Sequence, residues 1–388
     1  MHLSTRNVNT AFQDLVRLFD SASTNKAFSF TESRNGPVTY LHEPVTVTIE
    51  RPTERVLINR ARDCNPFFHL FESLWMLAGR DDVLPLSYYN SKIKDFSDNG
   101  ATFNGAYGYR WRQAYLGLDG YGNEIPCVDQ LQKIIEHLQQ TPNSRRAVLQ
   151  MWDVESDLLK VDGEDFSKDV CCNTEIMFAI RQTCETEQEW KNRGAIHDRE
   201  TGTYDIGRDG LYQCCEYFLD MTVINRSNDL VWGMLGANVV HFSMLLEWMA
   251  AQLDVQVGKM HTVSNNLHAY DWNWKPEEWL QDGQGKLYQE KYPETQPLGK
   301  IETEDIIDFV EQWSTANREQ KYLPLNTWDS FLRATAWPLM TAFTLHKKRR
   351  YEDAFFMANT CVSEDWRIVA IQWLAQRQEN WKEKQDEA

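Results

Sequence analysis

Two predicted helices, residues 64–78 and residues 236–253, constrain the fold of this chain more than any other feature. The first, CNPFFHLFESLWMLA, has a proline near its start, and Gly79 follows its end, which are usual start and stop signals of a helix. Both segments are so rich in apolar side chains that they are expected inside a core rather than on a surface. The chain can supply that core, because its 388 residues are 42% hydrophobic and 12% aromatic.

Segments with a strand pattern are distributed around these two helices. Residues 37–50 (PVTYLHEPVTVTIE) alternate apolar and polar side chains, as a half-buried strand does. Further strands are predicted at 147–154, 174–181, 217–225 and 267–272. Further helices are predicted at 9–19 and 129–140, whereas residues 80–125 are rich in loop signals. This mixture of helices and strands indicates the α/β (α+β) class.

The character of the chain changes after about residue 300. Helical periodicity then dominates, in segments 303–316, 327–346, 351–359 and 364–385. We therefore expect one domain over residues 1–300 and a helical C-terminal region over residues 301–388. Within the first domain, the polar segment 182–210 has almost no apolar periodicity, so we interpret it as an inserted surface loop or hairpin.

The charge and the cysteine pattern restrict partners and location. A formal net charge of −17 argues against a non-specific nucleic-acid binder, which needs a basic face. The eight cysteines include no C-x-x-C pair and no zinc-type spacing, so no metal site is expected. The N-terminus lacks the apolar run of a signal peptide, and no stretch of about 18 apolar residues suggests a membrane span. We expect a cytoplasmic protein (in the host cytoplasm if viral) with reduced thiols, and neither a membrane nor direct nucleic-acid contact.

Arginines stand beside several predicted strands. Arg34 lies in a turn before the first strand, Arg145 and Arg146 precede the strand at 147–154, and Arg226 follows the strand at 217–225. Arginine is well suited to bind phosphate, because its guanidinium makes paired hydrogen bonds. The alternative is solvation at the surface, which is the usual place of arginine.

A thiol and a carboxylate are candidates for chemistry. Cys172 follows Cys171 directly before a predicted strand, and nearby arginines would lower its pKa and make it a nucleophile. The alternative is a small buried hydrophobic residue. Glu72 interrupts the apolar helix 64–78, where burial would raise its pKa and let it exchange protons. It could equally lie on an outward polar stripe of that helix.

Three further polar residues suit the recognition of a base and a sugar. Asn238 lies at the start of the second apolar helix, where it could cap the helix or present its amide to a base edge. His268 and Tyr270 alternate in LHAYDW, so both point to the same face of a strand and could bind a sugar hydroxyl.

Taken in order over residues 25–275, these signals resemble the motifs of thymidylate synthase and its pyrimidine hydroxymethylase relatives. Arg34 matches the family's arginine before the first strand, and Glu72 matches the glutamate of its E-L-L-W-like helix. Further colinear matches are YGYRWR (107–112), TPNSRRAVLQMWD (141–153), the nucleophile at Cys172, NRSND (225–229), Asn238 and NLHAY (266–270). Colinear motifs are far more specific than any one of them alone.

The resemblance implies a thymidylate synthase-like fold, with a large mixed β-sheet flanked by helices, and a homodimer. It also implies transfer of a one-carbon unit from 5,10-methylenetetrahydrofolate to carbon 5 of a pyrimidine deoxynucleoside monophosphate, begun by thiolate attack on carbon 6. The implied catalytic residues are Cys172, Glu72, Tyr107 and Asp229. The implied substrate-binding residues are Arg34, Arg145, Arg146, Arg226, Ser227, Asn238, His268, Tyr270 and Asn173, with Arg145 and Arg146 coming from the partner subunit.

Departures from the family pattern gather on the folate side. Residues 87–100 lack the tryptophan pair that covers the folate, and the apolar C-terminal tail is replaced by KQDEA. These losses predict a wetter site, in which water rather than hydride completes the reaction. We therefore expect conversion of dUMP to 5-hydroxymethyl-dUMP, the chemistry that phages use for modified DNA. The alternatives are thymidylate synthesis from dUMP, hydroxymethylation of dCMP and, outside enzymes, an inactive nucleotide-binding scaffold.

Overall fold

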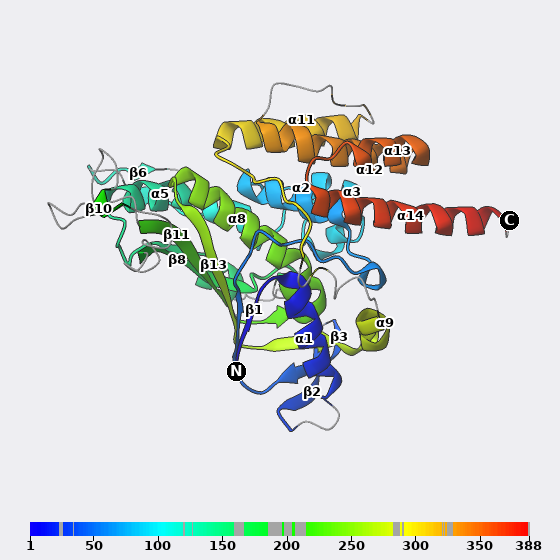
Figure 1. Cartoon of the computed structure of the whole chain (residues 1–388), viewed down its shortest axis with the longest axis horizontal. Coiled ribbons are helices and arrows are strands. Elements are labelled where there is room, and N and C mark those ends of the chain that lie inside the picture. Colours follow the sequence, from blue (N-terminus) through cyan, green and yellow to red (C-terminus); the bar gives the residue numbers. More distant parts are fainter. Residues whose placement is uncertain are drawn as a thin grey trace.

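The computed structural model describes the chain except for residues 23–25, 34, 119–120, 126, 159–166, 185–195, 198–203, 206–214, 282–287, 289–290, 320, 322, 324–328 and 387–388. Within the described part, helices flank a mixed β-sheet, and the C-terminal helices lie together at one end of the molecule (Figure 1). The α/β class and the mixed sheet predicted from the sequence are therefore confirmed.

The main sheet has six strands among the described residues, in the order β1-β4-β13-β11-β8-β7. Strand β11 pairs with β13 in parallel and with β8 antiparallel, so the sheet is mixed. Its strands are β1 (His2–Thr5), β4 (Val45–Ile49), β7 (Val148–Gln150), β8 (Asn173–Cys184), β11 (Cys215–Asn225) and β13 (Gln256–Ser264).

The central strand β13 was not predicted from the sequence. Its inward positions are Gly258, Met260, Thr262 and Ser264, of which only the methionine is strongly apolar. Strand prediction depends on an apolar inward face. The sequence of β13 therefore gives little indication of a strand, although the strand pairs with β11 on one side and β4 on the other.

A smaller sheet corrects the single strand predicted at residues 37–50. That segment forms two strands, β3 (Gly36–Leu41) and β4, which belong to different sheets. Pro44 lies between them and cannot donate to a strand ladder, which explains the break. The smaller sheet has the order β12-β14-β3-β2, with β12 (Asn228–Asp229), β14 (Leu267–Tyr270) and β2 (Phe28–Ser33).

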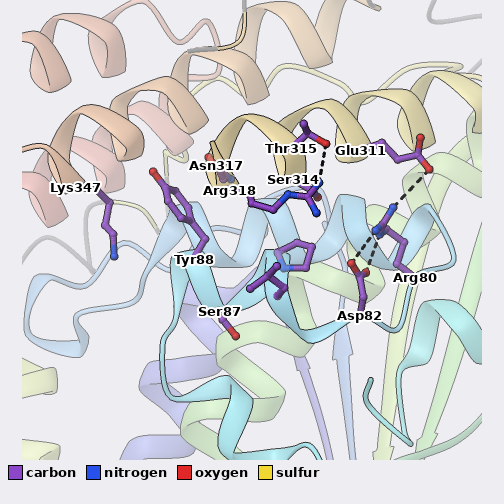
Figure 2. Close-up of a pocket in the computed structure, with 12 residues that line it drawn as sticks. Arg80, Asp82, Ser87, Tyr88, Glu311, Ser314, Thr315, Asn317, Arg318 and Lys347 are labelled. Atoms are coloured by element: carbon purple, nitrogen blue, oxygen red, sulfur yellow. Dashed lines mark hydrogen bonds and ion pairs between the residues drawn. The ribbon is translucent and has the colours of Figure 1, made fainter. Parts of the chain in front are cut away.

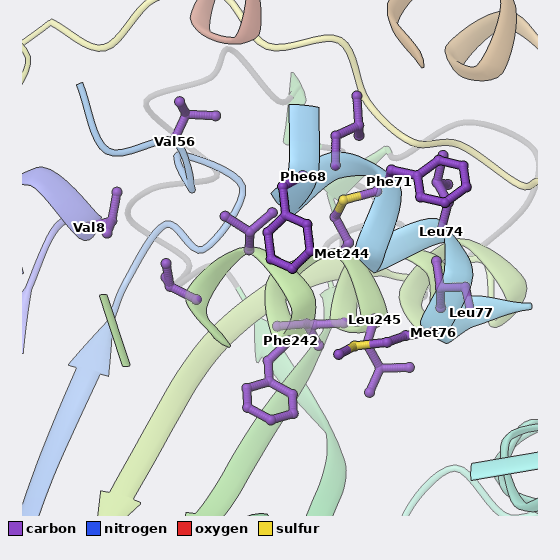
Figure 3. Close-up of a cluster of buried hydrophobic side chains, with 14 of the residues drawn as sticks. Val8, Val56, Phe68, Phe71, Leu74, Met76, Leu77, Phe242, Met244 and Leu245 are labelled. Carbon is purple, nitrogen blue, oxygen red and sulfur yellow. The ribbon is translucent and has the colours of Figure 1, made fainter. Parts of the chain in front are cut away.

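The two apolar helices are confirmed and pack against each other in the core. Every residue of α2 (Pro66–Leu77) is buried, as is most of α8 (Val239–Gln252). Figure 3 shows their apolar side chains meeting, Phe68 and Leu74 from α2 with Met244 and Leu245 from α8. Helix α8 continues a π-helical segment, η3 (Leu230–Asn238), so the helical stretch begins earlier than predicted.

Contrary to the sequence expectation, the stretch Leu230–Gln252 is long and apolar enough to cross a membrane by length and composition alone. However, 78% of its apolar window is buried inside the protein. This burial is what a core helix shows.

Several short elements surround these helices. The stretch 80–125, predicted to be loop-rich, contains α3 (Val83–Tyr89), η2 (Ile93–Phe96), α4 (Tyr107–Arg112) and a small hairpin, β5 (Gly117–Leu118) with β6 (Glu124–Ile125). Helix α4 approaches α2 so closely that a Cβ at Gly108 would lie 2.2 Å from the carbonyl oxygen of Met76. The other elements are η1 (Arg60–Arg62), α1 (Val8–Asp20), α5 (Gln130–Gln140), α6 (Val154–Asp157), η4 (Asp271–Asn273) and α9 (Pro276–Gln281).

Most of the predicted insertion 182–210 lies outside the described residues. Its described parts are the end of β8 and a short antiparallel pair, β9 (Ile196–His197) with β10 (Tyr204–Asp205). This pair agrees with the expected hairpin.

The C-terminal region is helical, as the periodicity predicted. It contains α11 (Thr303–Arg318), η5 (Leu332–Ala336), α12 (Trp337–Lys347), α13 (Tyr351–Asn359) and α14 (Glu364–Asp386). These helices share a core with α2, because the Phe67 ring lies 5.3 Å from that of Phe343 and 5.4 Å from that of Trp373. The domain boundary at residue 300 stays a prediction.

Candidate active site

A cavity of about 600 Å³ opens between α2, α4 and the η3–α8 helix. Five of the predicted site residues line it: Glu72, Tyr107, Cys172, Asp229 and Asn238. They come from α2, the start of α4, the turn before β8, and the two ends of η3. The fold therefore gathers, in one cavity, residues that are widely separated in the sequence.

The two adjacent cysteines have different surroundings. Cys171 is only 1% exposed, its Sγ lies 3.5 Å from the carbonyl oxygen of Gly105, and burial raises the pKa of its thiol far above the ordinary value. Cys172 is half-buried and lines the cavity. Only the thiolate is nucleophilic, so the Cys171 thiol is unsuited to attack.

Tyr107 lies close to this turn. Its hydroxyl accepts a hydrogen bond from the backbone N–H of Asn173 at 3.4 Å, and its ring stacks on Phe242 with 5.9 Å between centroids. Burial, followed by the nearby Cys172, raises the pKa of Tyr107 well above its ordinary value, so the phenol stays protonated. It can therefore donate a hydrogen bond into the cavity.

Asn173, predicted to bind substrate, is not among the residues that line the cavity. Its side chain is buried, and its amide nitrogen donates to the carbonyl oxygen of Ile224 on β11 at 2.7 Å. Alternation along β8 turns this side chain away from the neighbouring Cys172, so it secures the pairing of two strands instead.

Glu72 projects from the all-buried α2 and meets a histidine that the sequence analysis did not single out. Its Oε2 lies 2.9 Å from Nε2 of His241 on α8. A second histidine, His69, lies one turn earlier on α2 and also lines the cavity. Burial, with the positive charge of His241 and Arg62 nearby, lowers the pKa of His69 to about 3, so this imidazole is neutral near pH 7.

Asp229 and Asn238 mark the two ends of η3. The Asp229 carboxylate caps the helix start, accepting from the backbone N–H groups of Trp232 at 2.6 Å and of Val231 and Gly233 at 3.3 Å. Burial raises the pKa of Asp229, and these N–H groups lower it. Asn238 donates from Nδ2 to Oδ1 of Asn228 at 3.3 Å, and both asparagines line the cavity.

The predicted phosphate-binding arginines that the structure describes lie at two places. Arg226 is exposed beside the cysteine turn, where its Nε donates to the carbonyl oxygen of Cys171 at 2.8 Å. Arg145 and Arg146 are exposed at the start of the edge strand β7, and no ion pair among the described residues involves them. Arg34 lies outside the described residues.

The remaining predicted residues lie beside the cavity rather than in its lining. His268 and Tyr270 share one face of β14, with 5.4 Å between their ring centroids, as their alternation predicted. Pairing of β12 with β14 puts His268 opposite Asp229, and burial lowers the pKa of His268. Ser227 is half-buried in the turn before β12.

The cavity also contains residues that the sequence analysis missed. Trp232 is 50% exposed, lines the cavity and stacks on the Arg62 guanidinium at 4.3 Å. Arg377 comes from α14 and makes two hydrogen bonds with the Asp63 carboxylate, at 2.9 and 2.8 Å. Nothing in the sequence connects α14 with this site. His241, in contrast, carries the same signal as Glu72, since it is a polar residue inside an apolar helix.

A second cavity of about 610 Å³ lies between α3 and the C-terminal helices (Figure 2). Its charged groups mostly pair with one another, Arg80 with Asp82 at 2.7 Å and with Glu311 at 3.7 Å. None of the predicted site residues lines it. The first cavity, which five of the predicted site residues line, is therefore the candidate active site.

Comparison with known proteins agrees with this geometry. The family model for thymidylate synthase matches residues 58–312. A deoxyuridylate hydroxymethyltransferase of Pseudomonas phage M6 is 33% identical over 383 residues, which cover 97% of this chain and 94% of that protein.

Two further relatives align over shorter stretches. A deoxyuridylate hydroxymethyltransferase of Bacillus phage SP01 is 34% identical over 58% of this chain, and the chain spans about half (49%) of that protein. A thymidylate synthase of Streptococcus mutans is 27% identical over 46% of this chain and 53% of its own length.

Proposed function

Because this chain belongs to the thymidylate synthase family, we propose that it transfers a one-carbon unit from 5,10-methylenetetrahydrofolate to carbon 5 of dUMP, and that water completes the reaction to give 5-hydroxymethyl-dUMP. One observation carries the proposal. Cys172, Glu72 and Asn238 line one cavity in a chain that aligns over 97% of its length with a phage deoxyuridylate hydroxymethyltransferase.

The cavity suits a nucleotide together with a folate. Its volume of about 600 Å³ falls in the range of small-molecule sites, and its wall includes the aromatic rings of Trp75, Phe96 and Trp232. Such rings suit the flat pterin and benzoyl groups of 5,10-methylenetetrahydrofolate, and the Arg377 guanidinium suits its carboxylates. When bound, the folate supplies the one-carbon unit at the oxidation level of formaldehyde.

Cys172 begins the reaction in this proposal. Carbon 5 of uracil is a poor nucleophile, and addition of the Cys172 thiolate to carbon 6 turns it into a reactive enolate. Arg226 lies beside the cysteine turn, so its positive charge favours both the thiolate and the substrate phosphate. Protonated Tyr107, close to the same turn, can donate a hydrogen bond to the nucleotide.

Asn238 supports uracil as the base in this proposal. Its amide can accept from the ring N–H of uracil and donate to the adjacent carbonyl. The Nδ2 group already donates to Asn228, which holds the amide in one orientation. Cytosine presents the reverse pattern, so we propose that dUMP is preferred over dCMP.

A homodimer completes the site in this proposal. Val148 on β7 and Met177 on β8 are register partners, and they are 39% and 37% exposed. Exposed apolar side chains on neighbouring strands of a sheet suit contact with a second copy of the chain. Arg145 and Arg146 lie just before the edge strand β7, from where they could reach the partner's phosphate site.

The products test the proposed function. Purified enzyme would be incubated with 5,10-methylenetetrahydrofolate and either dUMP or dCMP, and the nucleotide analysed by mass spectrometry. We expect dUMP to gain one CH₂O, while the folate ends as tetrahydrofolate. A gain of CH₂ with stoichiometric dihydrofolate would identify a thymidylate synthase instead, and a preference for dCMP would overturn the assignment of the base.

A scaffold without activity is tested separately. With 5-fluoro-dUMP and the folate, an active enzyme should form a covalent complex through Cys172, because fluorine blocks the later proton loss. Absence of both complex and product would support the non-enzyme alternative.

A further inference from the structure

Two helices each present a pair of polar residues, one helical turn apart, to the same cavity. Helix α2 presents His69 and Glu72, whereas Asn238 and His241 lie where η3 continues into α8. Positions three apart lie on one face of a helix. Since α2 and α8 pack together, Glu72 and His241 meet in the wall, with 2.9 Å between Oε2 and Nε2.

This meeting leaves buried polar atoms without hydrogen bonds. His241 is 3% exposed, and among the described residues neither of its ring nitrogens has a hydrogen-bond partner. Oε2 of Glu72 also lacks a hydrogen-bond partner among the described residues. It lies close to Nε2 of His241, but the two groups are not aligned as a hydrogen bond. Buried polar groups in proteins are nearly always paired with protein or with ordered water. Both residues line the cavity, so the missing partner can enter from there.

The neighbouring groups do not supply that partner. His69 is held neutral by burial, and among the described residues the Asn238 amide nitrogen donates to Asn228 rather than to Glu72 or His241. The Glu72 carboxylate and the His241 imidazole therefore keep free hydrogen-bonding positions. Two such groups that converge on one point are suited to hold and deprotonate a water molecule. Such a water is the second reactant of hydroxymethylation.

We propose that His241, together with Glu72, holds the water molecule that adds to the exocyclic methylene of the nucleotide. This inference rests on the proposed function and names the residue that favours water as the reactant. His241 acts as a positioning residue, since it orients both the water and the Glu72 carboxylate.

The water oxygen forms a bond with the exocyclic carbon, the carbon–carbon π pair moves toward the carbonyl at carbon 4, and Glu72 receives the proton. The enolate then restores the double bond between carbons 5 and 6, and the bond from carbon 6 to the Cys172 sulfur breaks. The products are 5-hydroxymethyl-dUMP and the Cys172 thiolate.

Competition with a thiol tests this proposal independently of the overall rate. The exocyclic methylene is an electrophile, so 2-mercaptoethanol at a fixed concentration adds to it in place of water and gives a thioether nucleotide. His241→Leu keeps the volume but removes both ring nitrogens. We expect it to raise the ratio of thioether to hydroxymethyl product about tenfold, which corresponds to the loss of one hydrogen bond to a charged group. His241→Gln, which keeps an amide, should raise the ratio by a smaller factor.

Two controls separate this effect from a general disturbance. His346 on α12 is also a buried histidine, and its Nδ1 has no hydrogen-bond partner within the described part of the chain. It does not line the cavity, so His346→Leu should leave the ratio unchanged. Each His241 variant should still form the covalent complex with 5-fluoro-dUMP and folate, because that complex forms before water is needed.

The outcomes are distinct. A ratio equal to that of the wild type in a His241→Leu enzyme that forms the complex overturns the proposal, as does an equal rise in His346→Leu. If His241→Leu fails to form the complex, the comparison passes to His241→Gln, and an unchanged ratio there overturns it. Wild-type enzyme that yields no hydroxymethyl product would contradict the proposed function instead.

Discussion

Two adjacent cysteines differ in chemistry because one backbone step reverses the direction of a side chain. Cys171 points into the core beside Gly105, whereas Cys172 reaches the cavity. The two cysteines are adjacent in the sequence, so the difference in their reactivity comes from the burial of the Cys171 thiol. Burial raises the pKa of the Cys171 thiol although the positive charge of Arg110 acts in the opposite direction, so this thiol keeps its proton and does not attack the base.

Cys172→Ala should therefore abolish turnover, lowering kcat by at least about a thousandfold, the scale of removing a nucleophile. Binding of dUMP should stay near the wild-type value, because the phosphate and base contacts remain. Cys171→Ala should retain most activity and lose about 1 kcal/mol of stability from its buried site. Steady-state kinetics, dUMP titration calorimetry and thermal unfolding measure these effects. An inactive Cys171 variant beside an active Cys172 variant would show that the nucleophile had been misassigned.

At the scale of elements, α14 connects the C-terminal region with the catalytic cavity. The helix packs near α2, and its Arg377 binds Asp63 just before α2 begins. Its guanidinium also lies 4.3 Å from the Trp373 ring, which fixes its direction. Asp63 itself has a left-handed φ of 51°, an uncommon conformation for a non-glycine residue. Tyr107, by contrast, lies by the other end of α2, where Gly108 contacts Met76.

This placement predicts a role in folate affinity. Arg377→Ala should raise the KM for 5,10-methylenetetrahydrofolate about tenfold, the effect of losing one charged hydrogen-bond partner, with a smaller change in the KM for dUMP. Its effect on stability should be small, about 1 kcal/mol or less, because the ion pair is partly exposed. The matched control is Arg367→Ala, which removes an ion-paired arginine from the same helix outside the cavity lining. Equal kinetic effects of both variants would assign Arg377 a structural role only.

For the whole molecule, the decisive arrangement is the proposed pairing of two chains through the sheet. Arg146 is exposed at the edge strand β7 and does not line the cavity of its own chain. If it binds phosphate in the partner, each site of a dimer needs residues from both chains. A residue that one subunit contributes to the site of its partner can be tested by mixing two inactive variants.

Homodimers of Arg146→Ala and of Cys172→Ala should each be inactive. After reversible dissociation and random mixing, half of the dimers are heterodimers, and one of their two sites carries neither change, so about a quarter of wild-type activity should return. Differently tagged chains would verify heterodimer formation. Heterodimers that form but stay inactive would place Arg146 in its own chain's site, or outside the site altogether.

Local patterns in the sequence predicted the long helices and several strands, and they named the candidate reactive groups. Periodicity and end signals predicted α2, α8 and the four C-terminal helices, because the spacing of apolar residues reports which side of a helix is buried. The thymidylate synthase motifs identified Cys172 and Glu72, which line the cavity. Only the tertiary structure placed β13 in the main sheet, since its inward face of Gly258, Thr262 and Ser264 is not apolar. Likewise, only packing brought His241 against Glu72 and Arg377 into the lining of the cavity. Contacts between residues far apart in the chain depend on how whole helices pack. The spacing of residues within one segment does not predict that packing.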